Sequence, residues 1–204
     1  MSTDIDPRSL NLLVEEVMVH SNLALASYAE LSCLISDEET KQDRYCWAMI
    51  QSFLGHAAMV SKFVDPPRRT PASLARSTAI KSSLDISETS CVLDRTARNN
   101  VEHLDERLDD WIEAGPNGML EIVLDDRDAF EYLSESRPMT GGAPFFIKRV
   151  YIIEDGAFIT QGRNGVVEIK LGEMRDALHD IATKARVFLS EDSSITRIYP
   201  GSPR

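Results

Sequence analysis

Three polar residues in one short stretch combine groups that can act together on a phosphate ester. Arg98 and Asn99 precede His103 in the run Arg-Asn-Asn-Val-Glu-His. A histidine titrates near neutral pH and transfers protons, whereas an arginine stays charged and binds phosphate oxygens in a bidentate manner. An asparagine one turn before the histidine can orient the imidazole ring or the ligand. We therefore predict Arg98, Asn99 and His103 as catalytic residues for metal-independent cleavage of RNA, in which the arginine stabilises the charged phosphorane.

The element expected to position these residues is a helix over residues 88–113, with its most polar part at 95–110. At about 100° per residue, His103 falls on the face opposite the apolar seam, and Arg98 lies about 140° away from it. Convergence on one phosphate then requires long side chains, a local distortion of the helix, or contributions from two chains. The expected buried seam consists of Ala97, Val101, Leu104, Leu108 and Trp111.

The stretch from Arg98 to His103 resembles the Arg–polar–x3–His motif of HEPN domains. The resemblance assigns Arg98 as the motif arginine, Asn99 as its polar follower and His103 as the motif histidine. It implies an all-α bundle that usually dimerises and, in catalytic members, a metal-independent ribonuclease of toxin–antitoxin, abortive-infection or defence systems. In those members the arginine and the histidine meet across the two-fold axis, so the resemblance implies a homodimer with a composite site.

The distribution of charge leaves one region suited to anions in an otherwise acidic chain. The net charge of −11 argues against broad binding to nucleic acid or anionic membranes. Residues 62–81 nevertheless contain five basic residues and one acidic residue, a local charge of +4. We predict Arg68 and Arg69 of this segment, together with Arg95 and Glu102, as binding residues. The alternatives are a solvated loop at 62–81 and a charged helix face with ion pairs at 95–110.

Other histidines and carboxylates give weaker signals. Glu102, His103 and Glu106 share a helix face, but a metal site would need more ligands from other helices. We therefore expect no metal and no cofactor. His56 stands among apolar residues and is expected in the core, whereas His20 is expected at the surface of its helix.

Three cysteines stand far apart in the sequence, and the pattern indicates a reducing compartment. Cys33, Cys46 and Cys91 form no CxxC spacing, and an odd number is typical of reduced thiols. Residues 1–8 are acidic and lack the apolar stretch of a signal peptide, and we find no apolar run long enough to span a membrane. We expect a cytoplasmic protein without membrane contact.

The periodicity of apolar residues predicts a mainly α-helical fold: one domain over residues 1–204, an antiparallel helical bundle of HEPN-like type. A β-rich insertion at about 116–170 is expected to form a small antiparallel sheet before the last helix. A loop at 137–144 has no assigned role. Besides the helix at 88–113, helices are expected at 7–35, 38–64, 71–84 and 174–188, and strands at 119–124, 145–153, 157–159 and 166–170.

Two function classes are consistent with these features. The first is a homodimeric, metal-independent endoribonuclease of a toxin–antitoxin or phage-defence system, with RNA as substrate and an antitoxin as a second partner. The alternative is a non-catalytic HEPN-like dimeric module that binds a protein partner, a nucleotide or RNA through the same face. Cleavage of RNA in the presence of a chelator separates the two.

Overall fold

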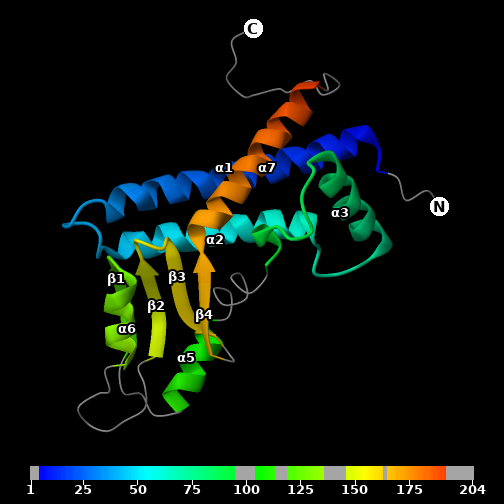
Figure 1. Ribbon diagram of the computed structural model, residues 1–204. Helices are drawn as coiled ribbons and strands as arrows, with labels where there is room; N and C mark the ends of the chain where they lie inside the picture. The colour runs from blue at the N-terminus through cyan, green and yellow to red at the C-terminus, as the bar shows by residue number, and fades with distance from the viewer. Residues whose placement is uncertain (1–4, 95–103, 114–118, 136–145, 163–164, 192–204) are drawn as a thin grey trace.

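The computed structural model describes residues 5–94, 104–113, 119–135, 146–162 and 165–191 (Figure 1). The first three helices and the last helix form one layer, and a four-stranded sheet lies against one side of it. The elements in chain order are α1 (Pro7–Ile35), α2 (Arg44–Val64), α3 (Pro71–Ser83), η1 (Cys91–Leu93), α5 (Leu104–Glu113), β1 (Met119–Leu124), α6 (Arg127–Glu135), β2 (Phe146–Ile152), β3 (Ala157–Gly162), β4 (Gly165–Lys170) and α7 (Leu171–Glu191).

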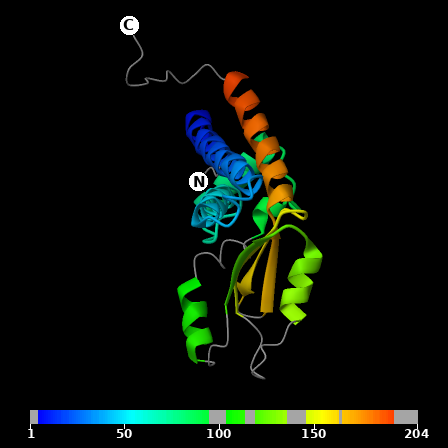
Figure 2. The same cartoon turned by 90° about the vertical axis from the view of Figure 1, so that its left-hand side faces the viewer.

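The helical layer is built on an antiparallel hairpin of α1 and α2, and α7 crosses one side of it (Figures 1 and 2). Helix α1 begins as predicted, because the Asp6 carboxylate accepts a hydrogen bond from the backbone N–H of Ser9 and Pro7 occupies the first turn. The predicted start of the second helix at residue 38 was wrong. Residues 38–43 form turns, and Asp43 caps α2 by accepting from the N–H of Tyr45 at 2.8 Å.

Helix α3 is shorter and packs against the C-terminal end of α2. Thr70 and Ser73 form a capping box at its start, which satisfies two backbone donors, and Pro71 follows the cap. The continuous helix predicted over residues 88–113 was wrong in its first part. Residues 88–90 form a turn and η1 follows, because the buried Val92 packs into the helical core and the Ser87 hydroxyl contacts that of Thr89.

The sheet has the strand order β1-β2-β3-β4 and is mixed, so the predicted antiparallel sheet was wrong in one pairing. Strand β1 runs parallel to β2, whereas β2–β3 and β3–β4 are antiparallel. The cause is α6, which the sequence reading missed. It carries the chain back across the sheet between β1 and β2, as a parallel connection requires. The predicted turn at Asp155-Gly156 is confirmed, since Gly156 has a φ of 57° between β2 and β3.

Helix α6 covers one face of the sheet (Figure 2). The Asp126 carboxylate caps this helix by accepting a hydrogen bond from the backbone N–H of Ala129 at 2.8 Å. In the sequence, Asp126 and the short run of apolar residues at helical spacing after it are the features that indicate α6. Arg127 at its start donates to Asp155 in the β2–β3 turn and to Glu168 on β4. This ion cluster ties α6 to the far side of the sheet. The apolar contact on this face is made by Ala129, Phe130 and Leu133 against Leu124, Ile147, Val150, Ile152, Ala157 and Ile159.

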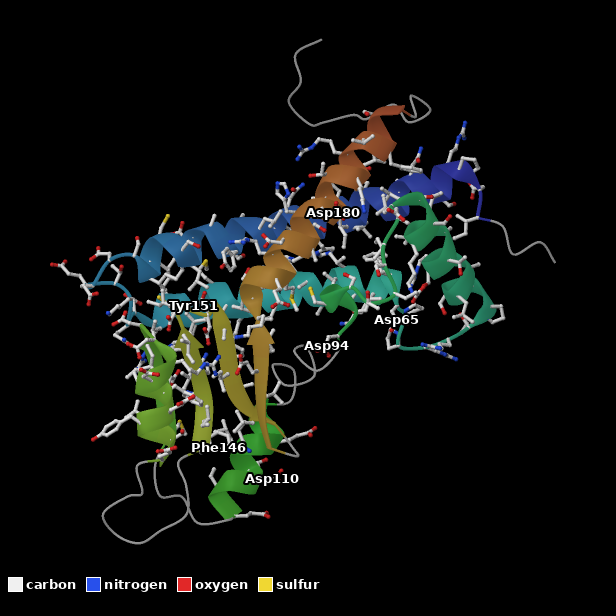
Figure 3. All side chains as sticks on the ribbon, viewed as in Figure 1. Asp65, Asp94, Asp110, Phe146, Tyr151 and Asp180 are labelled. Atoms are coloured by element: carbon white, nitrogen blue, oxygen red, sulfur yellow. The ribbon has the colours of Figure 1, made fainter. Side chains whose placement is uncertain are left out.

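The other face of the sheet packs against the helices, and Tyr151 lies at the junction (Figure 3). This side chain is fully buried, and its burial, followed by the nearby Tyr28, raises the pKa of the Tyr151 hydroxyl. The Arg175 guanidinium of α7 lies 5.1 Å from the centre of the Tyr28 ring. The outer edge of β1 is bonded to the segment before α2, because the Gln42 side chain donates to the carbonyl of Val123 and accepts from its N–H. The two layers therefore share one core.

None of the helices in the described parts of the chain combines the length and apolarity needed to cross a membrane. All three cysteines carry free thiols. Cys33 is exposed, Cys91 is half-buried and Cys46 is buried. Burial raises the pKa of the Cys46 and Cys91 thiols, which leaves both protonated near neutral pH.

Candidate functional site

Most of the residues predicted from the sequence to carry chemistry lie outside the described residues. These are the predicted catalytic residues Arg98, Asn99 and His103, and the predicted binding residues Arg95 and Glu102. Of the helix on which they were placed, α5 is described from Leu104 onward. The other two predicted binding residues, Arg68 and Arg69, are described, and both are exposed in the segment between α2 and α3.

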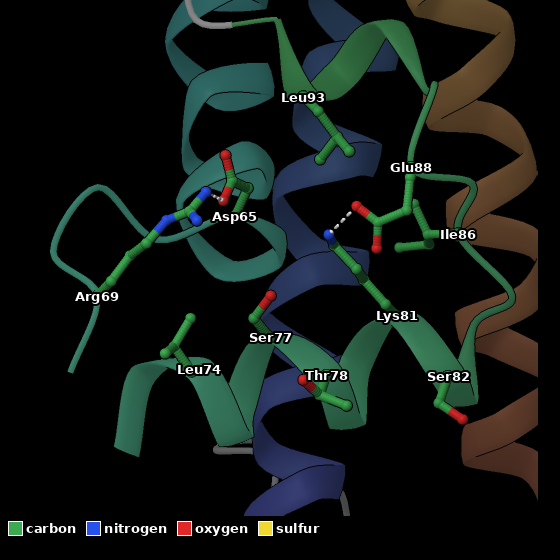
Figure 4. A pocket seen from close by; sticks show the side chains of 10 residues that line it. All are labelled: Asp65, Arg69, Leu74, Ser77, Thr78, Lys81, Ser82, Ile86, Glu88 and Leu93. Atoms are coloured by element: carbon green, nitrogen blue, oxygen red, sulfur yellow. Dashed lines mark hydrogen bonds and ion pairs between the residues drawn. The ribbon is translucent and has the colours of Figure 1, made fainter. Parts of the chain in front are cut away.

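Arg69 lines a pocket of about 600 Å³ bounded by α3, the C-terminal end of α2 and η1 (Figure 4). The pocket contains two cations, two carboxylates, three hydroxyls and three apolar side chains. Its size is that of pockets that hold small ligands. The lining residues are Asp65, Arg69, Leu74, Ser77, Thr78, Lys81, Ser82, Ile86, Glu88 and Leu93.

Helix α3 forms one side of this pocket because its lining residues share one face of the helix. Its pocket-lining residues recur at intervals of three and four, which places them on a single face. The buried Ser77 hydroxyl donates to the carbonyl of Val64, which attaches α3 to the last turn of α2. Thr78 and Ser82 stand one turn apart on the exposed part of this face. The pocket-lining residues of α3 are Leu74, Ser77, Thr78, Lys81 and Ser82.

The two cations of the pocket are each paired with a carboxylate (Figure 4). Arg69 lies 3.5 Å from Asp65, and its side chain is 69% exposed. Lys81 lies 2.6 Å from Glu88, whose side chain is 78% exposed. The described lining is thus balanced in charge. Each pair joins one largely exposed side chain to one that is mostly covered, because the side chains of Asp65 and Lys81 are only 23% and 18% exposed.

The other basic residues of segment 62–81 do not line the pocket. Arg76 donates to the carbonyl of Lys62 at 3.2 Å, and its guanidinium lies 5.6 Å from the centre of the Phe63 ring. Arg68 is exposed, and its carbonyl accepts a hydrogen bond from the Ser73 hydroxyl at 2.6 Å. Tertiary structure therefore divides the predicted basic segment and leaves Arg69 and Lys81 in the pocket.

A second cluster of titratable groups, His20 on α1 and His56 on α2, was missed in the sequence. Their Nδ1 atoms are 3.0 Å apart, so one ring donates and the other accepts, and the assignment of the proton depends on the tautomer. Burial, and then the charge of His20, lowers the pKa of His56. Phe63 lies against the pair, with its ring centre 6.5 Å from that of His20. The prediction that His20 is a solitary surface residue was wrong.

Groups of three or more histidine, cysteine, aspartate or glutamate side chains arranged to hold a metal ion do not occur within the described ranges. No protein-family model, curated protein or solved structure matches this chain.

Proposed function

We propose that this protein binds the phosphate groups of RNA in the pocket between α2, α3 and η1. The observation that carries the proposal is the placement of Arg69 and Lys81 on two sides of one open pocket, with the hydroxyls of Thr78 and Ser82 beside them. Arginine and lysine are the side chains that bind phosphate, and hydroxyls donate to its remaining oxygens. The pocket thus offers two cations and at least two further donors to one ligand.

Binding proceeds by exchange of ion pairs. The Glu88 side chain is largely exposed, so its carboxylate can rotate away from Lys81 towards solvent when a phosphate approaches Lys81. Arg69 can likewise leave Asp65, because their 3.5 Å separation is long for a charged hydrogen bond. The net charge of −11 opposes RNA at long range, so affinity should depend on these local contacts and fall with salt.

A second candidate function is cleavage of the bound RNA by Arg98, Asn99 and His103. The observation that favours it is that Leu93, which lines the pocket, precedes Arg95 by two residues and Arg98 by five in the sequence. The resemblance to HEPN domains supports a metal-independent reaction, a homodimer, a role in a toxin–antitoxin or defence system, and an antitoxin partner. The three widely spaced cysteines support a cytoplasmic setting. Binding without cleavage is the alternative, a HEPN-like module that takes RNA, a nucleotide or a protein partner.

Binding is tested by the fluorescence anisotropy of a labelled single-stranded RNA at several salt concentrations between about 50 and 200 mM. Arg69→Ala and Lys81→Ala should each weaken binding roughly tenfold and lower the salt dependence by about one ion, since each removes one charged contact. Arg186→Ala, at an exposed position on α7, is the matched control and should bind as the unmodified protein does. Equal affinity in all four proteins would remove the pocket from consideration.

Cleavage is tested with the same RNA in EDTA. If Arg98 and His103 carry the reaction, His103→Ala should abolish product while binding persists, and Arg98→Ala should reduce both binding and rate. RNA that stays intact with the unmodified protein, while Arg69 and Lys81 still determine affinity, would leave the binding module as the function.

A further inference from the structure

The pocket that contains Arg69 and Lys81 also has an apolar lining, which consists of Leu74, Ile86 and Leu93. Leu74 is on α3, Leu93 is on η1, and Ile86 is in the segment between these two elements. Leu74 is 43% exposed, whereas Ile86 and Leu93 are half-buried against the helical core. A phosphate is strongly hydrated and gains nothing from apolar contact, so phosphate binding leaves this lining unused.

The apolar lining stands on two sides of the pocket (Figure 4). Leu74 points from α3 towards η1, and Leu93 points from η1 towards α3. A flat group between them would contact apolar atoms on both of its sides, and the burial of such surface is favourable. The volume of about 600 Å³ is that of a pocket for a small organic ligand, so it has room for a ring as well as for a phosphate.

Both cations and the apolar lining belong to one pocket, so a single ligand meets both. A nucleotide combines the two matching surfaces, because its phosphate is charged and its base has two flat faces that bind apolar groups. Free phosphate would use only Arg69 and Lys81, and a purely apolar ligand would use only the lining. The hydroxyls of Thr78 and Ser82 lie on the same face of α3 and can bind an oxygen of the phosphate or the ribose.

We propose that the apolar lining is a subsite for one unpaired base of single-stranded RNA, an inference that rests on the proposed binding of RNA phosphates by Arg69 and Lys81. The bases of a duplex are stacked on one another, so a base enters a pocket only when it is outside a duplex. Proteins hold such a base between aromatic or apolar side chains, and Leu74 and Leu93 provide the apolar kind. The strand therefore binds through its phosphates and through one base at the same time.

The carboxylate of Asp65 gives this subsite a preference between the two pyrimidines. Asp65 lines the same pocket, and its side chain is mostly covered. A carboxylate accepts a hydrogen bond from the exocyclic amino group of cytosine, whereas uracil has a carbonyl oxygen at that position. When Arg69 turns from Asp65 to a phosphate, the amino group of cytosine replaces the donor that Asp65 loses. The subsite should therefore bind cytosine more tightly than uracil.

The subsite is tested by the fluorescence anisotropy of three labelled oligonucleotides of equal length: oligocytidine, oligouridine and an oligomer of abasic ribose units. The unmodified protein should bind oligocytidine roughly tenfold more tightly than the abasic oligomer, which has the same phosphates, and oligouridine with intermediate affinity. Equal affinity for oligocytidine and the abasic oligomer would overturn the base subsite. If Arg69→Ala and Lys81→Ala still weaken binding in that case, the phosphate contacts stand without it. If neither variant changes affinity, both proposals fail.

Leu74→Gln tests the apolar contact from the side of the protein. Leu74 is exposed and glutamine is a good helix former, so circular dichroism should not change. The variant should bind oligocytidine roughly fivefold more weakly, with the same salt dependence and the same affinity for the abasic oligomer, because it removes no charge. Leu12→Gln is the matched control, since Leu12 is 57% exposed on α1, and it should bind as the unmodified protein does. An equal loss with oligocytidine and the abasic oligomer would overturn the proposed contact with a base.

Two further measurements test the single strand and the base preference. A duplex of oligouridine with oligoadenosine should bind more weakly than oligouridine alone although it has more phosphates, because its bases are paired and stacked. Equal or tighter binding of the duplex would overturn the proposal. Asp65→Asn should narrow the difference between oligocytidine and oligouridine, because an amide both donates and accepts hydrogen bonds. An unchanged ratio of the two affinities would overturn the contact between Asp65 and the base.

Discussion

The two faces of the sheet are held in different ways. The face that meets the helices joins the large core of α1, α2 and α7, to which the sheet contributes Tyr151, Phe158 and Ile169. The face under α6 has a small apolar cluster and depends also on the ion cluster of Arg127. From this difference we predict that stability resides mainly in the contact between the layers, and that the α6 side contributes less. Three experiments test this comparison.

The largest effect is expected from truncation in the shared core. Phe53 on α2 is fully buried and packs against Tyr28, with ring centres 5.6 Å apart. Phe53→Ala should lower the free energy of unfolding by about 3–5 kcal/mol and destabilise both layers together. Leu133→Ala on α6 should lower it by only about 1–2 kcal/mol, because Leu133 is half-buried in the smaller cluster.

Urea unfolding followed by far-UV circular dichroism and tryptophan fluorescence measures both effects. Tyr132→Ala is the control, since this side chain is 75% exposed on the same helix, and it should change stability by less than about 0.5 kcal/mol. If Leu133→Ala is as destabilising as Phe53→Ala, the two faces of the sheet are equally important and the comparison fails.

A smaller effect is expected from the ion cluster on the α6 side. The Arg127 guanidinium, and then Lys170, lowers the pKa of Glu168 to about 2. An unfolded glutamate titrates at about 4.3, so this stabilisation is complete above that pH and is lost as the pH falls towards 2. Arg127→Met should lower the free energy of unfolding by roughly 1 kcal/mol at neutral pH; the effect is small because the charged groups are partly exposed. The variant should also lose less stability than the unmodified protein as the pH falls.

The matched control for Arg127→Met is Arg186→Met on the exposed side of α7. Unfolding midpoints in urea between about pH 5 and 2.5 give the comparison. If the unfolding midpoint of Arg127→Met falls with decreasing pH as steeply as that of the unmodified protein, the ion cluster does not hold α6 to the sheet.

The smallest effect concerns the histidine pair on the helical side. The pKa of His56 is lowered in the folded protein, whereas an unfolded histidine titrates at about 6.5. The unfolded chain therefore takes up the proton first, so stability is complete above about pH 6.5 and falls as the pH decreases below it. Among the described charged groups, Glu16 stands one turn from His20 on α1, and the Arg76 guanidinium lies 5.6 Å from the centre of the Phe63 ring. His56→Gln keeps a polar partner for His20 and should reduce the loss of stability between about pH 7.5 and pH 5.5.

Unfolding midpoints at about pH 7.5 and pH 5.5 measure the slope, and His179→Gln at an exposed position on α7 is the control. A slope that His56→Gln leaves unchanged, or that His179→Gln reduces equally, would show that the pair is not the titrating element.

The sequence predicted the long helices well because their signals are local. Asp6 and Pro7 start α1, and the apolar seams of α1, α2 and α7 repeat within one helix. The predicted helix at 88–113 failed at its start because Ser87 and Thr89 form a turn there and Val92 is drawn into the core. Helix α6 was missed because nine residues are too few for a clear period, although Asp126 offered a cap.

The sequence did not predict the pocket. Arg69 was expected to bind a ligand, but its pairing with Asp65 and its position opposite Lys81 follow from the way α3 packs on α2. Arg76 belonged to the same basic segment and was diverted to Phe63 by that packing. Charge counted along the chain therefore identified the segment and did not identify which cations share a site.

The sequence by itself determined where the long helices run, that one segment is basic in an acidic chain, and that Asp155-Gly156 turns between strands. These properties depend on neighbours within a few residues, where caps, periods and backbone preferences act. Tertiary structure alone decided that β1 is parallel to β2, that His20 meets His56, and that Arg69 and Lys81 share a pocket. Each of these joins groups that approach only when whole elements pack, and the energy that selects them comes from burying the faces between those elements rather than from any local pattern.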